Sequence, residues 1–480
     1  MFFLLTFAIS ILTIFLTWIP SLAKTKVGIT DIFPHFLKTA GEKFTGQGLS
    51  IFAFAFFLHA ILQSQTFQAL FASKRKWLQK RKYFTIGLIT ICAALLSSNL
   101  SWFDELIHFY PLVIPLLLAM GFDFFSSVLC LYGGSVAGLL GLVSTERITT
   151  HFNQCFSEVK GKINYTGLTG IGFRVASLAL FVSIIVLFNI WYCSRHRQAP
   201  TSVSDNLSKE SSPPRLNRTR KIILAVAGFF LVGSFVAQIP AVAKKLDGVA
   251  AKVPEYITNV ETKEDHEKLG TIEEMKVSKN QEKKVKNWGT FGKWEEQAVN
   301  CWLIIGGIII CLLAKQSIMK NLITAMQDSI PLLLIYIFAA VPATIIKNSG
   351  MAENLAEKLL PNTAQTAAAS LALYSSFGLS FLITFAVGST TSIATTLIAA
   401  FAPTLLAFGE STLIYAALFA WIGAIMGMAF SPNNGILRAS LEKGQTSYKQ
   451  FIKKTWTLGL IMLAASAGLA FSWTRFVIKN

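Results

Sequence analysis

The sequence is poor in charged side chains and lacks the motifs that carry most enzyme chemistry. Only 14% of its 480 residues are charged, and none of its six cysteines forms a CxxC pair. It contains no HExxH helix, no GxSxG turn, no Walker loop and no GxGxxG turn after a strand. The scattered cysteines argue against a disulfide framework and against a zinc site. We therefore expect no enzymatic activity, no metal and no cofactor, and find little support for an ATP-driven pump.

Long apolar segments are what the sequence does have. Hydrophobic residues make up 53% of the chain and the mean hydropathy is +0.54, more than one soluble core would hide. One helical crossing of a ~30 Å bilayer core needs about 20 apolar residues. Runs of this kind lie at 2–20, 48–72, 84–100, 106–120, 124–143, 171–193, 222–240, 298–314, 329–346, 364–387, 393–408, 411–430 and 455–473. The fold is predicted to be all-α, a polytopic transmembrane helix bundle in which the short or broken runs include re-entrant hairpins.

The first run, 2–20, resembles a secretory signal in its hydrophobicity alone. It lacks the basic start and the small-residue cleavage site of such a signal. We therefore expect it to be the first spanning helix.

The net charge of +18 comes largely from short loops. Basic clusters lie at 73–82, 194–198 and 215–221, each directly beside an apolar run. Short loops rich in Lys and Arg stay on the cytoplasmic side. These loops and the N-terminus are predicted to be cytoplasmic in a multi-pass protein of the cell membrane. A patch for nucleic acid or anionic lipid is the less favoured hypothesis, because topology explains the clusters more simply.

Segment 241–297 differs from the rest in composition. It holds 11 basic and 11 acidic residues and little hydrophobicity. A long neutral loop is tolerated on the outer face, and one crossing from the basic loop before it leads there. The chain is thus divided into an N-terminal membrane half (1–221), a transmembrane helix opening the second half (222–240), an extracytoplasmic polar loop (241–297) and a C-terminal membrane half (298–480).

The two halves share a sequence pattern. "PLLLAMG" (115–121) and "PTLLAFG" (403–409) keep Pro, two Leu, Ala and Gly at identical spacing. In the same order, Gly-rich apolar runs at 133–148 and 423–436 give way to polar residues. Interrupted segments at corresponding places in two halves indicate a transporter site, because unwound backbone is tolerated at membrane depth only where protein or a water-filled cavity satisfies it.

The first interrupted segment is "DELIHFYP", 104–111. Pro111 and Pro115 remove helix donors four residues apart, so the backbone before them is predicted to be kinked or broken. Asp104 and Glu105 would then lie at the mouth of the break. The alternative is that both are solvated loop residues before an ordinary Pro-kinked helix.

The second half offers two polar interruptions. Residues 388–392 form a Gly-led, hydroxyl-rich break whose side chains could contact a substrate or a coupling ion, although Ser and Thr also bond back to their own helix. "SPNNG" (431–435) is either a second such loop or a polar turn at a helix end. The predicted substrate-binding residues are Asp104, Glu105, Tyr110, Pro111, Ser144, Glu146, Gly388, Ser389, Thr390, Thr391, Ser392, Asn433 and Asn434.

Other ionisable residues receive different predictions. Most ionisable groups inside a membrane are functional, which also marks Asp123. Arg174 and Asp328 lie near the ends of apolar runs and are expected to snorkel or to lie in loops. His59 is expected to make a helix–helix contact rather than a proton relay.

"DELIHFYPLVIPLLLAMGFD" (104–123) resembles the E-x-I-x-F-Y-P-L-x-I-P-x-x-x-A-x-G-x-D stretch of the YfcC-type permeases. These are described as basic amino acid antiporters for substrates such as arginine and ornithine. They are related to four-carbon dicarboxylate carriers and, more distantly, to aminobenzoyl-glutamate transporters of the ion transporter superfamily. Residues 11–20, 170–174 and 431–456 are similar to further segments of the family. The resemblance implies two inverted repeats whose hairpins meet at mid-membrane, and alternating access.

The chain departs from the family pattern at two expected binding loops. Ser144 to Arg147 stand where an Asn-Pro is usual, and Gly388-Ser389-Thr390 stand where Gly-Ser-Gly is usual. The resemblance covers nearly the whole chain except 241–297. The family's substrate is therefore not carried over with the fold.

The favoured function is a secondary transporter, an exchanger or an ion-coupled permease, for a small polar solute, foremost an amino acid. A cationic amino acid would need the carboxylates of Asp104, Glu105 and Glu146, whereas a C4-dicarboxylate would need Arg147 and Arg438. A non-transporting scaffold that uses the outer loop for interactions is the alternative from another class. Expected partners are the substrate, a coupling cation where transport is ion-driven and the lipid bilayer, but no nucleic acid; assembly into a homo-oligomer is left open.

Overall fold

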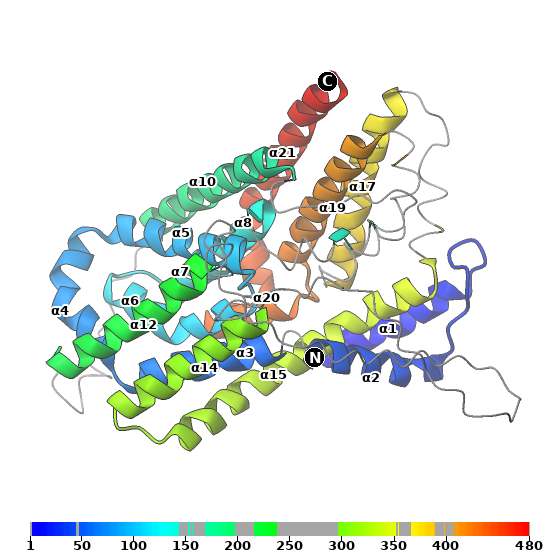
Figure 1. Cartoon of the computed structure of the whole chain (residues 1–480). Coiled ribbons are helices and arrows are strands. Elements are labelled where there is room, and N and C mark those ends of the chain that lie inside the picture. The colour runs from blue at the N-terminus through cyan, green and yellow to red at the C-terminus, as the bar shows by residue number, and fades with distance from the viewer. Residues whose placement is uncertain are drawn as a thin grey trace, which may run out of the picture.

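The computed structural model describes residues 2–44, 48–143, 152–153, 156, 169–196, 216–237, 296–351, 354, 366–388, 398, 406 and 409–479. Within these residues the regular structure is helical throughout (Figure 1). The longer helices are α1 (Phe2–Thr17), α2 (Ile32–Lys43), α3 (Leu49–Gln63), α4 (Thr66–Lys80), α5 (Lys82–Leu100), α6 (Tyr110–Ala119), α8 (Gly134–Gly141), α10 (Ile171–Arg195), α12 (Arg218–Ala237), α14 (Glu296–Leu313), α15 (Ile318–Asn348), α17 (Thr366–Val387), α19 (Glu410–Phe430), α20 (Gly435–Lys443) and α21 (Tyr448–Lys479). Short elements are η1 (Ile29–Asp31), η3 (Glu105–Phe109), α7 (Phe124–Val128) and the π-helical η4 (Leu129–Gly133).

Seven helical segments of the described chain are long and apolar enough to cross a membrane, or up to eight when a bent pair is counted as one span. This confirms the all-α polytopic fold. The spans are Lys82–Leu100, Phe124–Gly141, Ile171–Arg195, Arg218–Val236, Ile318–Ile346, Glu410–Phe430 and Tyr448–Trp473. Helix α1 has 16 residues and is among the shorter apolar helices, so its crossing stays a prediction. Of the predicted outer loop, only Glu296 and Gln297 are described, and they begin α14.

The run predicted at 48–72 is two helices, because the chain bends between α3 and α4. Gln65 adopts a left-handed conformation at φ 55°, and the pair is bent by 58°. Arg220 at the start of α12 donates from Nε to the Ser64 carbonyl at 3.4 Å. The basic end of α12 therefore lies at the α3–α4 bend, and α12 also contacts α4, which carries the 73–80 cluster (Figure 1). These basic clusters must therefore share one side of the membrane. That this side is the cytoplasm stays a prediction.

Glycines allow a close helix pair in each half. In the first half, a Cβ on Gly134 would lie 2.6 Å from the Thr90 carbonyl oxygen of α5, and one on Gly138 would collide with Ala94. In the second half, a Cβ on Gly427 would collide with the Phe381 carbonyl of α17, one α19 turn beyond Gly423. Both helices thus use a Gly-x-x-x-Gly stripe to approach the helix that packs against them. The similarity of packing supports a relation between the halves, while the inverted repeat stays a prediction.

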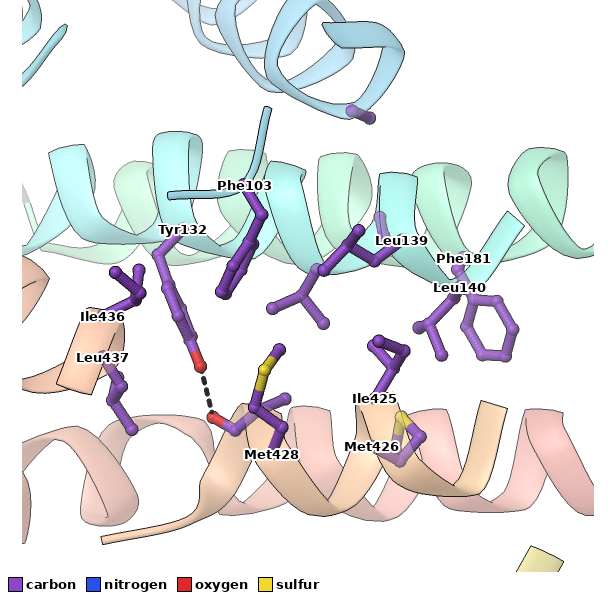
Figure 2. Packing of buried hydrophobic residues seen from close by; sticks show 14 of the residues in the cluster. Phe103, Tyr132, Leu139, Leu140, Phe181, Ile425, Met426, Met428, Ile436 and Leu437 are labelled. Carbon is purple, nitrogen blue, oxygen red and sulfur yellow. Dashed lines mark hydrogen bonds between the residues drawn. The ribbon is translucent and has the colours of Figure 1, made fainter. Parts of the chain in front are cut away.

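The two halves pack together through α8 and α19. Figure 2 shows Leu139 and Leu140 facing Ile425, Met426 and Met428 across this interface. All five side chains are buried and belong to the same apolar cluster. The Trp421 indole on α19 crosses the same interface, donating from Nε1 to the Leu139 carbonyl at 3.0 Å.

We expect Gly427→Ala to destabilise the protein by about 1–3 kcal/mol, because its methyl group would overpack the α17–α19 contact. Thermal unfolding of the purified protein in detergent would measure the effect. Gly468→Ala on α21 is the matched control, since no atom lies within 4 Å of a Cβ built there. Equal unfolding temperatures for the two variants would show that this close approach is not needed for stability.

Candidate functional site

The first interrupted segment breaks where the sequence predicted. Helix α5 ends at Leu100 and is followed by Ser101, which is left-handed at φ 54°; the 3₁₀ helix η3 then precedes α6. Pro111 is the second residue of α6, where its missing N–H would have no helical acceptor. It therefore begins the helix. Pro111 itself is exposed, whereas the polar side chains described next are buried.

Asp104 and Glu105 are buried within this break. Their exposed fractions are 4% and 1%, which excludes the alternative of solvated loop residues. Ser50 on α3 donates from Oγ to Glu105 Oε1 at 2.7 Å. A carboxylate withdrawn from water costs several kcal/mol unless partners compensate. Intramembrane carboxylates are by default candidates for a functional site, so the binding role of Asp104 and Glu105 stays a prediction.

Elements of both halves surround η3. It contacts α3, α6, η4 and α20. Tyr110, the residue after η3, is buried, and its hydroxyl neighbours Ser440 on α20 and Tyr132 on η4. The predicted acidic segment thus lies against the second half rather than at the outer surface.

In the second half, the 431–434 loop caps the end of α17. Ser431 Oγ donates to the Phe385 carbonyl at 2.7 Å, and Asn433 Nδ2 donates to the Ala386 carbonyl at 2.6 Å. The last carbonyls of a helix lack intrahelical donors, so these bonds satisfy groups that lipid could not. Gly388 follows directly, with φ +84°, and a Cβ on it would lie 2.5 Å from the Asn433 carbonyl carbon. Gly388, the one described residue of the 388–392 interruption, therefore touches the 431–435 loop.

Asn434 connects this loop to the first half. Its Oδ1 accepts from the N–H groups of Ile436 and Leu437 and so caps α20, while its Nδ2 donates to the Tyr132 hydroxyl at 3.0 Å. Tyr132 in turn donates to the Ala429 carbonyl at 3.0 Å, the dashed bond in Figure 2. "SPNNG" is therefore a polar turn at a helix end and also a buried link between the halves. We call Glu105, Tyr110, Tyr132, Asn433 and Asn434 the polar junction.

Two members of this site were missed from the sequence. Ser50 and Tyr132 stand singly in apolar runs, with no polar neighbours to single them out. The only signal at Tyr132 is a hydroxyl beside the Gly133-Gly134 pair of the predicted Gly-rich segment.

The remaining predicted residues lie outside the described part of the chain. They are Ser144, Glu146, Ser389, Thr390, Thr391 and Ser392, together with Arg147. Their place in a binding site stays a prediction.

Arg174 and Asp328 were predicted to snorkel or to lie in loops, and both predictions were wrong. Arg174 is buried and donates from Nη1 at 2.9 Å to the Leu142 carbonyl at the end of α8, so it does not snorkel. Asp328 lies inside α15, which starts eleven residues before the predicted run 329–346. It bonds His59 on α3 at 2.8 Å. The expected helix–helix contact of His59 is thereby confirmed.

Asp123 has a structural explanation. Its Oδ1 accepts from the Ser126 N–H at 2.9 Å and caps α7, while Oδ2 accepts from the Tyr192 hydroxyl at 2.8 Å. Lys454 on α21 lies 3.7 Å from the same oxygen. Asp123 therefore ties α7, α10 and α21 together.

No cluster in the described residues suits a metal. Groups of three or more His, Cys, Asp or Glu side chains that could hold an ion are absent from the part of the chain that the structure describes. A small hollow of about 30 Å³ beside Tyr132 is lined by apolar side chains such as Val136, Ala429 and Leu458. It does not offer the charged groups that a polar solute would need.

Comparison with known proteins places this geometry in context. The model of the family described as "DcuC: C4-dicarboxylate anaerobic carrier" matches residues 17–472. The chain is similar to the YdaH transporter of Alcanivorax borkumensis, with 16% identity, coverage of 99% of this chain and 98% of that one, and a TM-score of 0.49. It is also similar to MtrF of Neisseria gonorrhoeae, with 14% identity, coverage of 98% and 94%, and a TM-score of 0.48.

A curated protein of Haemophilus influenzae, itself uncharacterized, is 22% identical over 151 residues. The match covers 32% of this chain and 28% of that protein, so it spans little more than a quarter of the relative's length.

Proposed function

The chain belongs to the C4-dicarboxylate anaerobic carrier (DcuC) family, and we propose that it carries a small carboxylate-bearing solute across the cell membrane by alternating access. The observation that supports this most is the polar junction. A broken helix entrance from the first half and the caps of α17 and α20 from the second meet there in a buried place. Broken helices whose ends meet inside a membrane protein are the usual construction of a secondary carrier's solute site.

A C4-dicarboxylate is the proposed substrate, and Arg438 on α20 is its proposed ligand. Arg438 is half-buried beside the junction, donates from Nε to the Pro432 carbonyl at 2.8 Å and stacks over Tyr448 at 5.2 Å. A guanidinium has five N–H donors in a planar fork, so a carboxylate can still bind its outer edge. Asp104 and Glu105 would then serve a coupling cation rather than the solute.

A basic amino acid is the second candidate, favoured by the buried carboxylates. Glu105 begins η3, which contacts α20, and Asp104 directly precedes it, so these buried carboxylates could receive an ammonium or guanidinium group. In that case the substrate's own carboxylate would face Arg438, and the two acidic residues would set the preference for a cationic side chain.

Uptake and exchange in proteoliposomes with radiolabelled succinate, fumarate, arginine and ornithine would test the proposal. We expect succinate to exchange, and Arg438→Gln to raise its half-saturation concentration about 10- to 100-fold, since a charged hydrogen bond contributes roughly 1.5–3 kcal/mol. Arg218→Gln at the exposed start of α12 is the control. Exchange of arginine but not succinate would select the second candidate. Failure of every solute to move would leave a non-transporting scaffold.

A further inference from the structure

Four of the segments able to span a membrane have an end in one region of the structure. Helix α5 begins at Lys82, α7 begins at Phe124, α10 ends at Arg195 and α21 begins at Tyr448. The ends of spanning helices lie at the level of the phospholipid headgroups, outside the ~30 Å hydrocarbon core. Charged side chains that gather here are therefore within reach of those headgroups.

Side-chain contacts hold these helix ends together. The Lys82 ammonium on α5 lies 5.9 Å from the centre of the Phe122 ring. Asp123, the next residue, accepts a hydrogen bond from the Tyr192 hydroxyl of α10 at 2.8 Å, and the Lys454 ammonium of α21 lies 3.7 Å from the same carboxylate oxygen. The ends of α5, α10 and α21 thus meet around the short connection between α6 and α7.

The positive charge at these ends is largely unbalanced. Helices α4, α5, α10 and α21 contain no Asp or Glu residue. We call Lys82, Arg195, Lys449, Lys453 and Lys454 the basic seam. Within the described residues, the pair of Lys454 with Asp123 is the only ion pair that the seam makes. Its other four charges have no carboxylate counter-ion there, and Arg195, Lys449 and Lys453 are exposed.

Helices α10 and α21 pack side by side away from the seam (Figure 1). At the seam, the centre of the Tyr192 ring lies 5.5 Å from the Lys454 ammonium. At the other end of the pair, the ring centres of Phe173 and Trp473 are 5.2 Å apart. The two helices therefore run antiparallel, and they belong to different halves of the chain. A molecule that binds both helices would join the two halves.

Helix α10 carries an exposed stripe that leads from apolar to basic side chains. Leu187, Trp191 and Arg195 are four residues apart and so lie on one face of the helix. Leu187 is 67% exposed, Trp191 is exposed as well, and the Arg195 guanidinium carbon lies 4.9 Å from the centre of the Trp191 ring. Exposed Trp side chains are typical of the membrane–water interface.

Helix α21 repeats this order in the opposite chain direction. Lys453, Trp456 and Leu460 are three and four residues apart, which again places them on one face. All three are exposed, Leu460 by 56%. From the seam toward the membrane interior, each helix thus presents a basic residue, a Trp and a Leu. A phospholipid has the same order of parts: a charged headgroup, an interfacial region and acyl chains.

We propose that the basic seam binds the phosphodiester group of an anionic phospholipid whose acyl chains lie along the stripes of α10 and α21. The Arg195 guanidinium can hold two phosphate oxygens at once, and the lysines supply compact charges. Basic residues between membrane helices are typical of headgroup sites. A free inorganic anion would contact the seam alone and leave the Trp and Leu stripes unused. This binding does not depend on which solute the protein carries.

Lipid binding to the purified full-length protein in neutral detergent would test the proposal, by native mass spectrometry and thermal unfolding. We expect phosphatidylglycerol to bind about tenfold more tightly than phosphatidylcholine and to raise the unfolding temperature more than inorganic phosphate does. The double variant Arg195→Gln/Lys453→Gln should lose about tenfold in affinity for phosphatidylglycerol. Arg218→Gln/Lys38→Gln is the matched control, because it removes the same two charges from exposed positions on α12 and α2.

Three outcomes would overturn the proposal. Unchanged affinity in the seam variant would show that the seam does not hold the headgroup. An equal loss in both double variants would show that net charge alone attracts the lipid. Equal stabilisation by inorganic phosphate would show a site for a soluble anion.

A second measurement locates the lipid without changing the seam. Phosphatidylglycerol brominated in its acyl chains should quench the tryptophan fluorescence of the wild type more than brominated phosphatidylcholine at equal mole fraction. That excess should disappear in Trp191→Phe/Trp456→Phe and persist in Trp18→Phe, a control that removes another exposed Trp. An excess that persists without Trp191 and Trp456 would place the lipid elsewhere and refute the site.

Discussion

Replacing Glu105 with glutamine is expected to weaken transport about 10- to 100-fold while the folded yield stays near that of the wild type. The amide oxygen of glutamine can still accept the hydrogen bond from Ser50, so the packing of η3 on α3 is kept. The buried negative charge is lost, and with it a charged contact that contributes roughly 1.5–3 kcal/mol to binding of a cation or a solute. Concentration dependence of exchange in proteoliposomes and thermal unfolding in detergent would separate these two effects.

Glu442→Gln is the matched control for this change, because Glu442 is exposed on α20, a helix that contacts η3. We expect it to transport like the wild type. Should Glu105→Gln do so as well, the buried carboxylate would be a structural feature of the helix entrance, and the segment 104–111 would have no direct part in transport.

The transmembrane helices could be predicted because hydropathy is a local property of the chain. The run at 171–193 is α10, Ile171–Arg195, and the run at 411–430 is α19, Glu410–Phe430. Helix α15 was predicted too short, since Lys320 and Asp328 lower the hydropathy of its first turns. Asp328 is accommodated by a partner on α3, and a partner 269 residues away leaves no mark in the local sequence.

Single polar residues of the candidate site could be predicted from the sequence, but the hydrogen bonds that join them could not. Backbone breakers and polar clusters singled out Glu105 and Asn433 to Asn434, and the structure shows these residues to be buried. The bond from Asn434 to Tyr132 joins residues 302 apart, and the bonds to the α17 carbonyls join residues 46 and 47 apart. Such contacts depend on how helices pack, which the order of residue types does not determine.

Substituting Gly388 with alanine is expected to have the largest effect on the second half of the site. An alanine at φ +84° costs about 1–2 kcal/mol in backbone strain, and its methyl group would meet the Asn433 carbonyl carbon and oxygen at 2.5 and 2.6 Å. Overpacking against backbone adds about 1–3 kcal/mol, because backbone cannot rotate away as a side chain can. The least costly relief is for the 431–434 loop to move away from α17.

That movement would weaken the caps on Phe385 and Ala386 and displace Asn434 from Tyr132, so the two halves would lose their polar link. We therefore expect Gly388→Ala to reduce exchange at least tenfold and to lower the unfolding temperature. Gly378→Ala within α17 is the control, since a Cβ there meets no atom within 4 Å and alanine favours the helix. If Gly388→Ala exchanged solute as fast as Gly378→Ala, the contact between the two polar interruptions would not be part of the transport site, because a loop that can move away without cost cannot be the element that positions the solute.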